Sequence, residues 1–492
     1  MGGGAVPAPR RARPPDGLRA SRRHPVHQGE ARMTWPGITV NAEGRNEIDI
    51  LTPQVADLRF AAQYAPVATG QAAALAALAS LSKVIRLTPG ATYAIDAPVA
   101  LGAGTTIEGN GATIALTRKG SITLGDRSKL RDVFFVNQGL TGFVGGERCI
   151  TIQGSGVEVT GCTLGGQGYR MGIVIEFVNA AGASIAGACD NVLIERNRFE
   201  NTAFGVLKQG GPSSAYASAH GLRIIRNVFK TIRRGDAIEL NAGADTGVLI
   251  DGNIIDDVTA NNTVNAGFGI GVAGLGAYSA AESEAFRRFR IVNNIITNCE
   301  MQGIHAEKSA AFTITGNHVE QTSTTRKGTG QGIVTYGSMN GDITDNYVAG
   351  FDYGIEDMMG VTANAYTVAT DRNRIYANRV RDCATGVLVE LAGLGKSVFV
   401  DRNVLTDCAV GIRHRGSANT SFTGNQFIDC PTPFALDLNA DAFANVAASA
   451  RSLALVGNLA VSYKGVAMSN TYAHLAGAVI SGSGNSFPLP SA

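Results

Sequence analysis

One short phrase recurs along this chain and constrains its fold more than any other feature. The phrase has the form β-x-β-x-x-Asn-x-β, where β is a branched or other apolar residue, and it returns at intervals of 22 to 41 residues. Its asparagines are Asn197, Asn227, Asn253, Asn294, Asn317, Asn346, Asn378, Asn403, Asn425 and Asn458. A repeat this short cannot bury an apolar face alone, so successive repeats must stack on one another and share a core.

A second strand signal follows many of these asparagines. About a dozen residues later, a glycine precedes a branched residue, at Gly205, Gly269, Gly303, Gly332, Gly354, Gly386 and Gly411. A coil of ~22 to 25 residues with two or three short strands predicts an all-β chain that folds as a single right-handed parallel β-helix. We expect the repeated asparagine to occupy a turn and to bond backbone groups of the neighbouring coil.

The composition is consistent with a solenoid of short strands and close turns. Glycine accounts for 62 of 492 residues, and charged residues make up only 17%. The hydrophobic content of 45% suffices for a sizeable core, yet no apolar run reaches the ~18 residues of a membrane span. The net charge of +2 is unevenly spread, because seven arginines lie within residues 1–32 beside only Asp16 and Glu30.

Local composition predicts four parts of the chain. Residues 1–33 are rich in arginine and proline, so we expect a disordered extension. Residues 34–83 form an N-terminal cap whose alanine- and leucine-rich stretch at 71–82 predicts a helix. The β-helix is expected over 84–460, and residues 461–492 are expected to form a C-terminal cap or tail.

The cysteines indicate a structural role. There are seven, without a CxxC pair or metal-type spacing, so we expect neither a disulfide framework nor a metal site. Cys383, Cys408 and Cys430 each lie five residues after a repeated asparagine, which predicts a stack of buried side chains on successive coils. His414 is expected to point inward as a core histidine.

Alternation of side chains along the glycine-led strands predicts an outward-facing row of carboxylates. In this interpretation Glu239 and Glu307 share one row, two coils and roughly 9 to 10 Å apart, and Gly271 and Ala273 leave the floor between them bare. Two carboxyl groups beside a shallow groove are what glycoside hydrolysis needs. Asp236, three residues before Glu239, is a second candidate partner. We therefore predict Asp236, Glu239 and Glu307 as an acid–base set.

Further polar residues are expected to line the same groove and bind substrate: Lys208, Gln209, Asn241, His305 and Tyr336. A lyase remains open, because His305 or Tyr336 beside Glu307 would suit proton abstraction next to a uronate carboxylate. An exposed glutamate is also an ordinary solvated residue, which leaves a binding role open. The inserted loops at 208–221 and 259–288 are rich in Gly, Ser, Asn and Tyr, a composition suited to sugar hydroxyls.

Three phrases carry a family resemblance. Phe204-Gly-Val-Leu-Lys-Gln-Gly210, Gly235-Asp-Ala-Ile-Glu-Leu-Asn241 and Gly269-Ile-Gly-Val-Ala-Gly-Leu-Gly276 occur in this order. They resemble the central coils of WcaM-type colanic acid biosynthesis proteins over about residues 150–430. More loosely, the chain resembles phage tailspike depolymerases of the pectate-lyase-like fold. Pectin-cleaving β-helix enzymes match less well, since their Asn-Thr-Asp and Gly-His-Gly signatures and calcium cluster are not found.

The resemblance implies a β-helix protein that handles a branched, acidic bacterial exopolysaccharide. It also implies a periplasmic or extracellular location, although no signal peptide is visible after Met1 or Met33. We expect a polysaccharide partner without nucleic acid, membrane or cofactor, and a monomer or a tailspike-like homotrimer. A glycoside hydrolase is the leading interpretation; the alternatives are a polysaccharide lyase, a binding protein for polymer assembly or export, and a tailspike-like depolymerase.

Overall fold

The computed structural model covers most of the expected solenoid. It describes residues 39–40, 47–49, 71–117, 119–143, 146–176, 189–209, 219–241, 245–260, 266–274, 286–359, 372–391, 397–415, 419–436, 452–461, 468–470, 479–483 and 485. The extension expected at 1–33 and most of the tail expected at 461–492 lie outside the described residues, as do Tyr216, Asn261, Asn262, Asn265 and Tyr278 of the two inserted loops.

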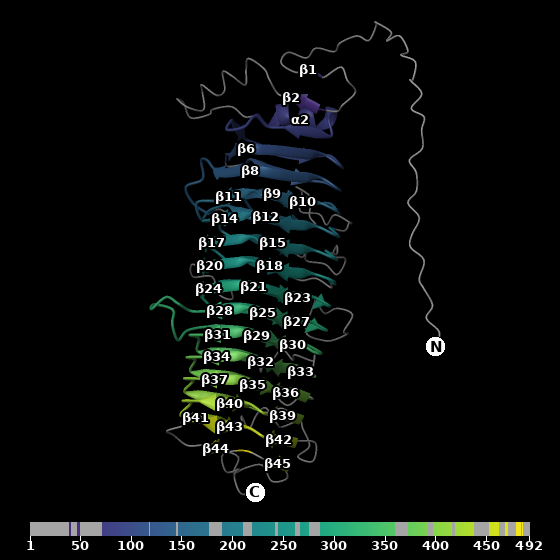
Figure 1. Cartoon of the computed structure of the whole chain (residues 1–492). Helices are drawn as coiled ribbons and strands as arrows, with labels where there is room; N and C mark the ends of the chain where they lie inside the picture. Colours follow the sequence, from purple (N-terminus) through teal and green to yellow (C-terminus); the bar gives the residue numbers. More distant parts are fainter. Residues whose placement is uncertain are drawn as a thin grey trace, which may run out of the picture.

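Each complete coil contains three short strands. In one coil these are β16 (Arg223–Ile225), β17 (Val228–Ile232) and β18 (Ile238–Leu240), with the repeated asparagine between the first two. Equivalent strands of successive coils pair in parallel and in register. Figure 1 shows the coils stacked along one axis, which is the right-handed parallel β-helix expected from the repeat.

The strands fall into series that follow the coils. Before the asparagine lie β10 (Glu158–Thr160), β13 (Leu193–Glu195), β16, β19 (Leu249–Asp251), β23 (Arg290–Val292), β27 (Thr313–Thr315), β30 (Asp342–Thr344), β33 (Asn373–Tyr376), β36 (Ser397–Asp401), β39 (Asn419–Thr423), β42 (Ser452–Val456) and β45 (Val479–Ser483). After it lie β11 (Thr163–Gly165), β14 (Arg198–Glu200), β17, β20 (Ile254–Val258), β24 (Ile295–Cys299), β28 (His318–Glu320), β31 (Tyr347–Ala349), β34 (Arg379–Arg381), β37 (Val404–Thr406), β40 (Gln426–Ile428) and β43 (Leu459–Val461).

The third strands form a separate parallel sheet, called the site sheet below. Its members are β5 (Pro98–Leu101), β7 (Ser121–Leu124), β9 (Arg148–Ile152), β12 (Met171–Glu176), β15 (Val206–Gln209), β18, β21 (Phe268–Ala273), β25 (Gln302–Glu307), β29 (Gln331–Tyr336), β32 (Tyr353–Met359), β35 (Thr385–Leu391), β38 (Val410–His414), β41 (Thr432–Leu436) and β44 (Met468–Asn470). The first coils add β1 (Thr39–Val40), β2 (Glu47–Asp49), β3 (Val84–Arg86), β4 (Thr92–Ile95), β6 (Thr106–Leu116) and β8 (Lys129–Asn137), and β22 (Phe286–Arg287) pairs with β26 (Ser309–Ala310).

The repeated asparagines form a continuous ladder of hydrogen bonds inside the turns. The Asn317 carboxamide oxygen accepts bonds from the backbone N–H and the side-chain amide of Asn294, at 3.0 and 2.9 Å. The Asn317 amide in turn donates to the Ile291 carbonyl at 2.9 Å and to the Asn346 side chain at 3.0 Å. The same pattern links all ten predicted asparagines and continues to Asn485, which confirms their turn role.

The interior of the coils is apolar and closely packed. All seven cysteines are buried with free thiols, and the Cys408 and Cys430 thiols donate to carbonyls of the preceding coil, as a structural stack requires. His414 is 3% exposed and packs edge-on against Phe422, so its expected core position is confirmed. Burial lowers the pKa of His414 to about 4, which keeps the imidazole neutral.

The two ends of the solenoid contain more structure than a simple series of coils. The predicted helix is α2 (Ala72–Leu81), which buries Leu75 and Leu78 and lies at the N-terminal end of the stack in Figure 1. Paired strands also extend beyond residues 84–460, the limits expected for the β-helix, because β2 pairs with β3 and β45 pairs with β42. No helix among the described residues is both long and apolar enough to span a bilayer.

The ladder predicts a large loss of stability when an internal asparagine is removed. Asn317→Ala would leave the Asn294 N–H without its acceptor in a dry turn and would remove the side-chain bonds to the Ile291 carbonyl and to Asn346, each at a cost of ~1 to 3 kcal/mol. We expect the free energy of unfolding to fall by about 3 kcal/mol or more, measured by chemical denaturation. Gln426→Ala, at an exposed position of β40, is the control and should change stability by about 0.5 kcal/mol or less. Equal effects of the two substitutions would contradict a stabilising ladder.

Candidate active site

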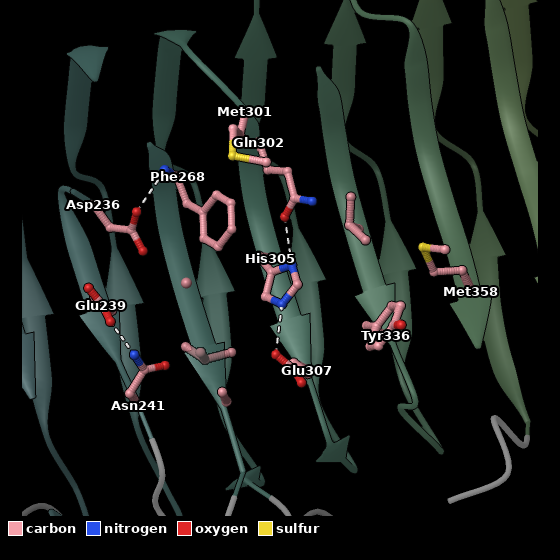
Figure 2. A pocket seen from close by; sticks show the side chains of 14 residues that line it. Asp236, Glu239, Asn241, Phe268, Met301, Gln302, His305, Glu307, Tyr336 and Met358 are labelled. Atoms are coloured by element: carbon pink, nitrogen blue, oxygen red, sulfur yellow. Dashed lines mark hydrogen bonds and ion pairs between the residues drawn. The ribbon is translucent and has the colours of Figure 1, made fainter. Parts of the chain in front are cut away.

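A cavity of about 580 Å³ opens on the outer face of the site sheet. It is lined by strands β18, β21, β25, β29 and β32 and by the turns that precede them. In Figure 2, Asp236, Glu239 and Asn241 form one wall, and Gln302, His305 and Glu307 face them from the other side of β21. We call this cavity the carboxyl pocket, because the three predicted acid–base residues all line it.

The register of the coil that carries Glu239 differs from the expected one. Glu239 pairs with Gly271, which pairs with His305, so Glu239 does not share a row with Glu307. The expected row placed Glu239 four residues after Gly235, as if Gly235 were the repeated glycine of this coil. Ala237 holds that position instead, because its carbonyl accepts from the Val206 N–H and its N–H donates to the Phe268 carbonyl.

Gly235 has a different role, in the turn before the strand. A Cβ atom there would lie 1.9 Å from the Phe204 ring, so only glycine fits against this side chain. The two-residue displacement places Asn241, rather than Glu239, in the row of Ala273 and Glu307. Glu239 and Glu307 therefore face each other diagonally across the pocket, two coils apart and two residues apart along the strands.

Small residues on β21 keep the floor of the pocket open. Gly271 lies between Glu239 and His305, and a Cβ atom there would come within 3.2 Å of the Asp236 Oδ2 atom and of the Phe268 ring. Ala273 occupies the same position relative to Asn241 and Glu307. The expected bare floor is therefore present between the two walls.

Asp236 and Glu239 form a buried carboxyl pair on one wall. Asp236 is 2% exposed, and its Oδ1 atom accepts hydrogen bonds from the Gly267 and Phe268 N–H groups at 2.9 and 2.8 Å. Burial raises the pKa of Asp236 well above its ordinary value, and the nearby Glu239 carboxylate raises it further. Burial likewise raises the pKa of Glu239 to about 7, although a hydrogen bond from the Asn241 amide opposes this. The pair thus retains a proton near neutral pH.

His305 and Glu307 form the opposite wall. The His305 ring stacks on Phe268, with centroids 5.0 Å apart, and its Nε2 atom lies 3.3 Å from the Glu307 Oε2 atom. Its Nδ1 atom lies 2.6 Å from the Gln302 side-chain oxygen. Burial lowers the pKa of His305 to about 4, so the ring is neutral at pH 7 and carries one N–H. One of its two neighbours must therefore donate a hydrogen: the Gln302 amide in its flipped orientation, or a protonated Glu307.

The Glu307 carboxyl group is partly buried, with a side chain 23% exposed. Burial raises its pKa, and the adjacent Lys308 ammonium works in the opposite direction. All three predicted acid–base residues consequently lie in surroundings that favour the protonated form more than water does. Such shifts are common at catalytic sites because they bring carboxyl groups into the working pH range.

The predicted substrate-binding residues do not all reach the pocket. Asn241, His305 and Tyr336 line it, as expected. Lys208 does not, which corrects the sequence prediction: its side chain points into the core, is 0% exposed and forms an ion pair with the buried Asp245. The physical reason is alternation, since Lys208 pairs with the inward-facing Leu240. Gln209 ends β15 one residue later, and its side chain lies outside the described set.

Sequence reasoning did not identify Phe268, Met301 and Gln302 as pocket residues. Phe268 and Gln302 immediately precede a repeated glycine, at the corner where the chain enters the site sheet. Strand alternation does not set side-chain direction at a corner, so it gave no signal for them. A rule that aligned the residue before each repeated glycine would have grouped both with Asp236, which precedes Ala237. The described residues contain no cluster of three or more His, Cys, Asp or Glu side chains arranged to hold a metal ion.

Comparison with known proteins identifies one family. A family model described as "Colanic acid biosynthesis WcaM" matches residues 88–350, just over half of the chain. The match begins earlier and ends earlier than the 150–430 expected from the three phrases. It includes four of the five strands that line the carboxyl pocket, β18, β21, β25 and β29, and ends before β32. No curated protein matches the chain.

Several solved structures are similar in fold at low identity. The Azotobacter vinelandii mannuronan C-5 epimerase AlgE4 A-module is 15% identical, with a TM-score of 0.45, over 79% of this chain and 94% of that one. The Streptococcus pneumoniae surface adhesin PfbA is 13% identical, with a TM-score of 0.44, over 77% and 92%. The alginate lyase AlyF-OU02, in complex with G6, is 15% identical, with a TM-score of 0.41, over 73% and 82%.

The raised pKa of Glu239 predicts a pH-dependent gain in stability for Glu239→Gln. A carboxyl group whose pKa is higher in the folded than in the unfolded protein destabilises the fold progressively as pH rises from about 4.5 to about 7. Glutamine mimics the protonated side chain and removes this cost. We expect Tm of Glu239→Gln to match the wild type at pH 4 and to exceed it by a few degrees at pH 8, measured by calorimetry. A difference in Tm that is independent of pH would contradict the assignment.

Proposed function

Because the chain belongs to the WcaM family of colanic acid biosynthesis proteins, we propose that it is a glycoside hydrolase that cleaves an acidic exopolysaccharide in the carboxyl pocket. The observation that carries this proposal is the placement of carboxyl groups on opposite walls of an open cavity with a bare floor. The family description supplies the class of polymer, and the pocket supplies the chemistry.

Glu239 is the proton donor in this proposal. Its pKa of about 7 and its partnership with Asp236 keep a proton on that wall at neutral pH. Glu239 would transfer this proton to the glycosidic oxygen as the bond between that oxygen and the anomeric carbon breaks. Asp236 acts as a positioning residue, because its Oδ1 atom is held by two backbone N–H groups, and burial together with the Glu239 carboxylate raises its pKa, so the pair holds a proton in common.

Glu307 is the general base. It would accept a proton from a water molecule whose oxygen attacks the anomeric carbon from the opposite face. A displacement of two coils and two residues separates the Cα atoms of Glu239 and Glu307 by about 12 Å, from ~4.8 Å per coil and ~3.3 Å per residue. Side chains that reach inward from that separation leave space for water between them, which favours the inverting over the retaining mechanism.

The lining of the pocket favours hydrolysis over elimination. A lyase must neutralise the carboxylate of the uronate whose proton it removes, for which arginine or lysine is suited. The residues described around the carboxyl pocket include three carboxyl groups and neither arginine nor lysine. A uronate carboxylate placed at the reacting position would therefore be repelled rather than neutralised.

Removal of either acid–base group should abolish turnover without unfolding the protein. Glu239→Gln and Glu307→Gln should each lower kcat by about 100-fold or more, since general acid–base groups contribute ~10² to 10⁴. Glu320→Gln is the matched control, because Glu320 bonds a histidine, His318, in the same i, i+2 geometry on β28, outside the pocket. Wild-type kcat in both pocket variants would refute the assignment.

The assay should distinguish the reaction classes. We would incubate acidic exopolysaccharides, colanic acid among them, with the protein and follow viscosity, new reducing ends and unsaturated-uronate absorbance. A hydrolase produces reducing ends without new absorbance. Both signals together would indicate a lyase, with Tyr336 or His305 as the candidate base. Retention of intact polymer without either signal would indicate a binding protein.

The activity should decline on the alkaline side of about pH 7. Glu239 must be protonated to act as an acid, and its pKa of about 7 sets the upper limit. The Glu307 base must be ionised, and its raised pKa moves the lower limit above the ordinary range for glutamate. We expect a bell-shaped profile of kcat/KM centred in the mildly acidic range. A profile that stays flat to pH 9 would exclude Glu239 as the acid.

A further inference from the structure

A second cavity, of about 570 Å³, lies at the corner of the solenoid where the chain enters the site sheet. We call it the arginine cleft, because Arg233 and Arg234 line it together with Tyr169, Asn201, Thr259 and Glu300. These residues come from turns of successive coils, between the strand that follows the repeated asparagine and the site-sheet strand. The expected acid–base set does not include any of them.

The arginine cleft adjoins the carboxyl pocket. Arg234 lies two residues before Asp236 on the same turn, and Glu300 is followed directly by Met301 and Gln302, which line the carboxyl pocket. The same corner of the same coils therefore contributes to both cavities. A polymer that leaves the carboxyl pocket over this corner would pass into the arginine cleft.

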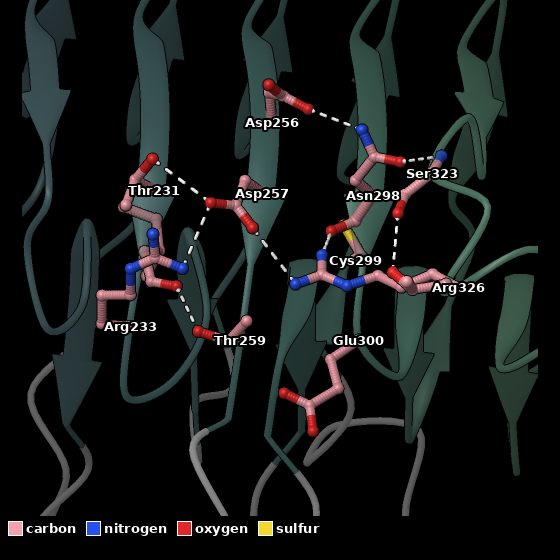
Figure 3. Close-up of polar contacts among 12 residues, drawn as sticks. Thr231, Arg233, Asp256, Asp257, Thr259, Asn298, Cys299, Glu300, Ser323 and Arg326 are labelled. Carbon is pink, nitrogen blue, oxygen red and sulfur yellow. Dashed lines mark hydrogen bonds and ion pairs between the residues drawn. The ribbon is translucent and has the colours of Figure 1, made fainter.

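A network of ion pairs fixes the orientation of Arg233, as Figure 3 shows. Arg233 contacts the Asp257 Oδ2 atom at 3.2 Å, and Arg326 contacts the other oxygen, Oδ1, at 3.1 Å. Thr231 also donates to Asp257. One carboxylate thus holds two guanidinium groups, so it cannot neutralise both charges, and 41% of the Arg233 side chain stays exposed.

Arg234 is positioned against an aromatic ring. Its guanidinium carbon lies 5.6 Å from the centroid of the Phe143 ring, a cation–π distance that retains the positive charge. Glu300, the acidic residue of the cleft, accepts a hydrogen bond from the Ala260 N–H at 2.7 Å. The cleft lining thus contains two guanidinium groups against one carboxylate.

The two cavities carry opposite charge, so acidic and neutral sugars of one polymer would bind at different places. The carboxyl pocket would repel a sugar carboxylate, whereas planar guanidinium groups form paired hydrogen bonds with one. We propose that the arginine cleft binds the carboxylate of an acidic sugar while a neutral sugar of the same chain occupies the carboxyl pocket. This inference rests on the proposed function for the identity of the polymer, but the charge-selective binding can be measured without turnover.

The test measures binding in a variant that cannot turn over substrate. In the full-length Glu239→Gln protein, we would titrate a glucuronate-containing oligosaccharide and its carboxyl-reduced counterpart by calorimetry, at low and at high salt. Arg233→Gln and Arg234→Gln should each weaken binding of the acidic oligosaccharide about tenfold or more and leave the neutral one within about twofold. Arg233→Lys, which keeps the charge but loses the planar fork, should retain an intermediate affinity.

Arg223→Gln is the matched control, since Arg223 is an exposed arginine on β16 of the same coil, before the asparagine turn. It should leave both affinities unchanged. Equal losses for the acidic and neutral ligands, an Arg223→Gln effect as large as that of Arg233→Gln, or wild-type affinity in both cleft variants would overturn the proposal, as would failure of the parent to bind the acidic ligand. Thermal unfolding of each variant shows whether the fold is retained, and Arg234→Gln leaves the Asp257 network intact.

The failures of the two proposals are distinguishable. Charge-selective binding that depends on Arg233 and Arg234, in a protein that releases no reducing ends, would support the proposed role of the arginine cleft and refute the proposed hydrolase activity. Hydrolysis that depends on Glu239 and Glu307, with equal affinity for acidic and carboxyl-reduced ligands, would support the proposed hydrolase activity and refute the proposed role of the arginine cleft.

Discussion

The asparagine ladder is the interaction on which the rest of the structure depends. Each ladder side chain bonds the next asparagine and a carbonyl of the preceding coil, so every turn has the same shape and the same height. The residue before each of the ten predicted ladder asparagines adopts a left-handed backbone, whether it is Gly316 or Arg402, which shows that the ladder overrides local preference. A uniform turn at one corner leaves the other corners free to accept insertions.

A stack that is fixed at one corner presents the other faces as ordered rows. On the site sheet, one row contains Glu239, Gly271 and His305, and the next contains Asn241, Ala273 and Glu307. Small residues on β21 between two strands with large polar side chains produce the carboxyl pocket. The same partial burial that shapes the pocket raises the pKa values of its carboxyl groups. These groups can therefore hold and release protons near neutral pH, at a cost in folding stability.

Membership of the WcaM colanic acid biosynthesis family agrees with a surface divided by charge. Carboxyl groups dominate one cavity, and guanidinium groups outnumber carboxylates in the adjoining cleft. Because both cavities are built from consecutive turns of the same coils, their separation follows from the solenoid repeat. A polymer chain laid across these coils would meet both environments in sequence, which relates the proposed chemistry to the proposed specificity.

The sequence by itself determined the repeat, the ladder asparagines, the buried cysteine stack, the α2 helix, and the strand face that carries Glu307. These features depend on local periods and on residue types that suit a single environment. Only the tertiary structure decided the register at Glu239, because Ala237 replaced the expected glycine and moved that row by two residues. It also decided the inward pairing of Lys208 with Asp245 and the contact of Asp257 with Arg326, 69 residues apart. Such contacts join different coils, and the number of residues in each turn, rather than any local pattern, decides which side chains meet.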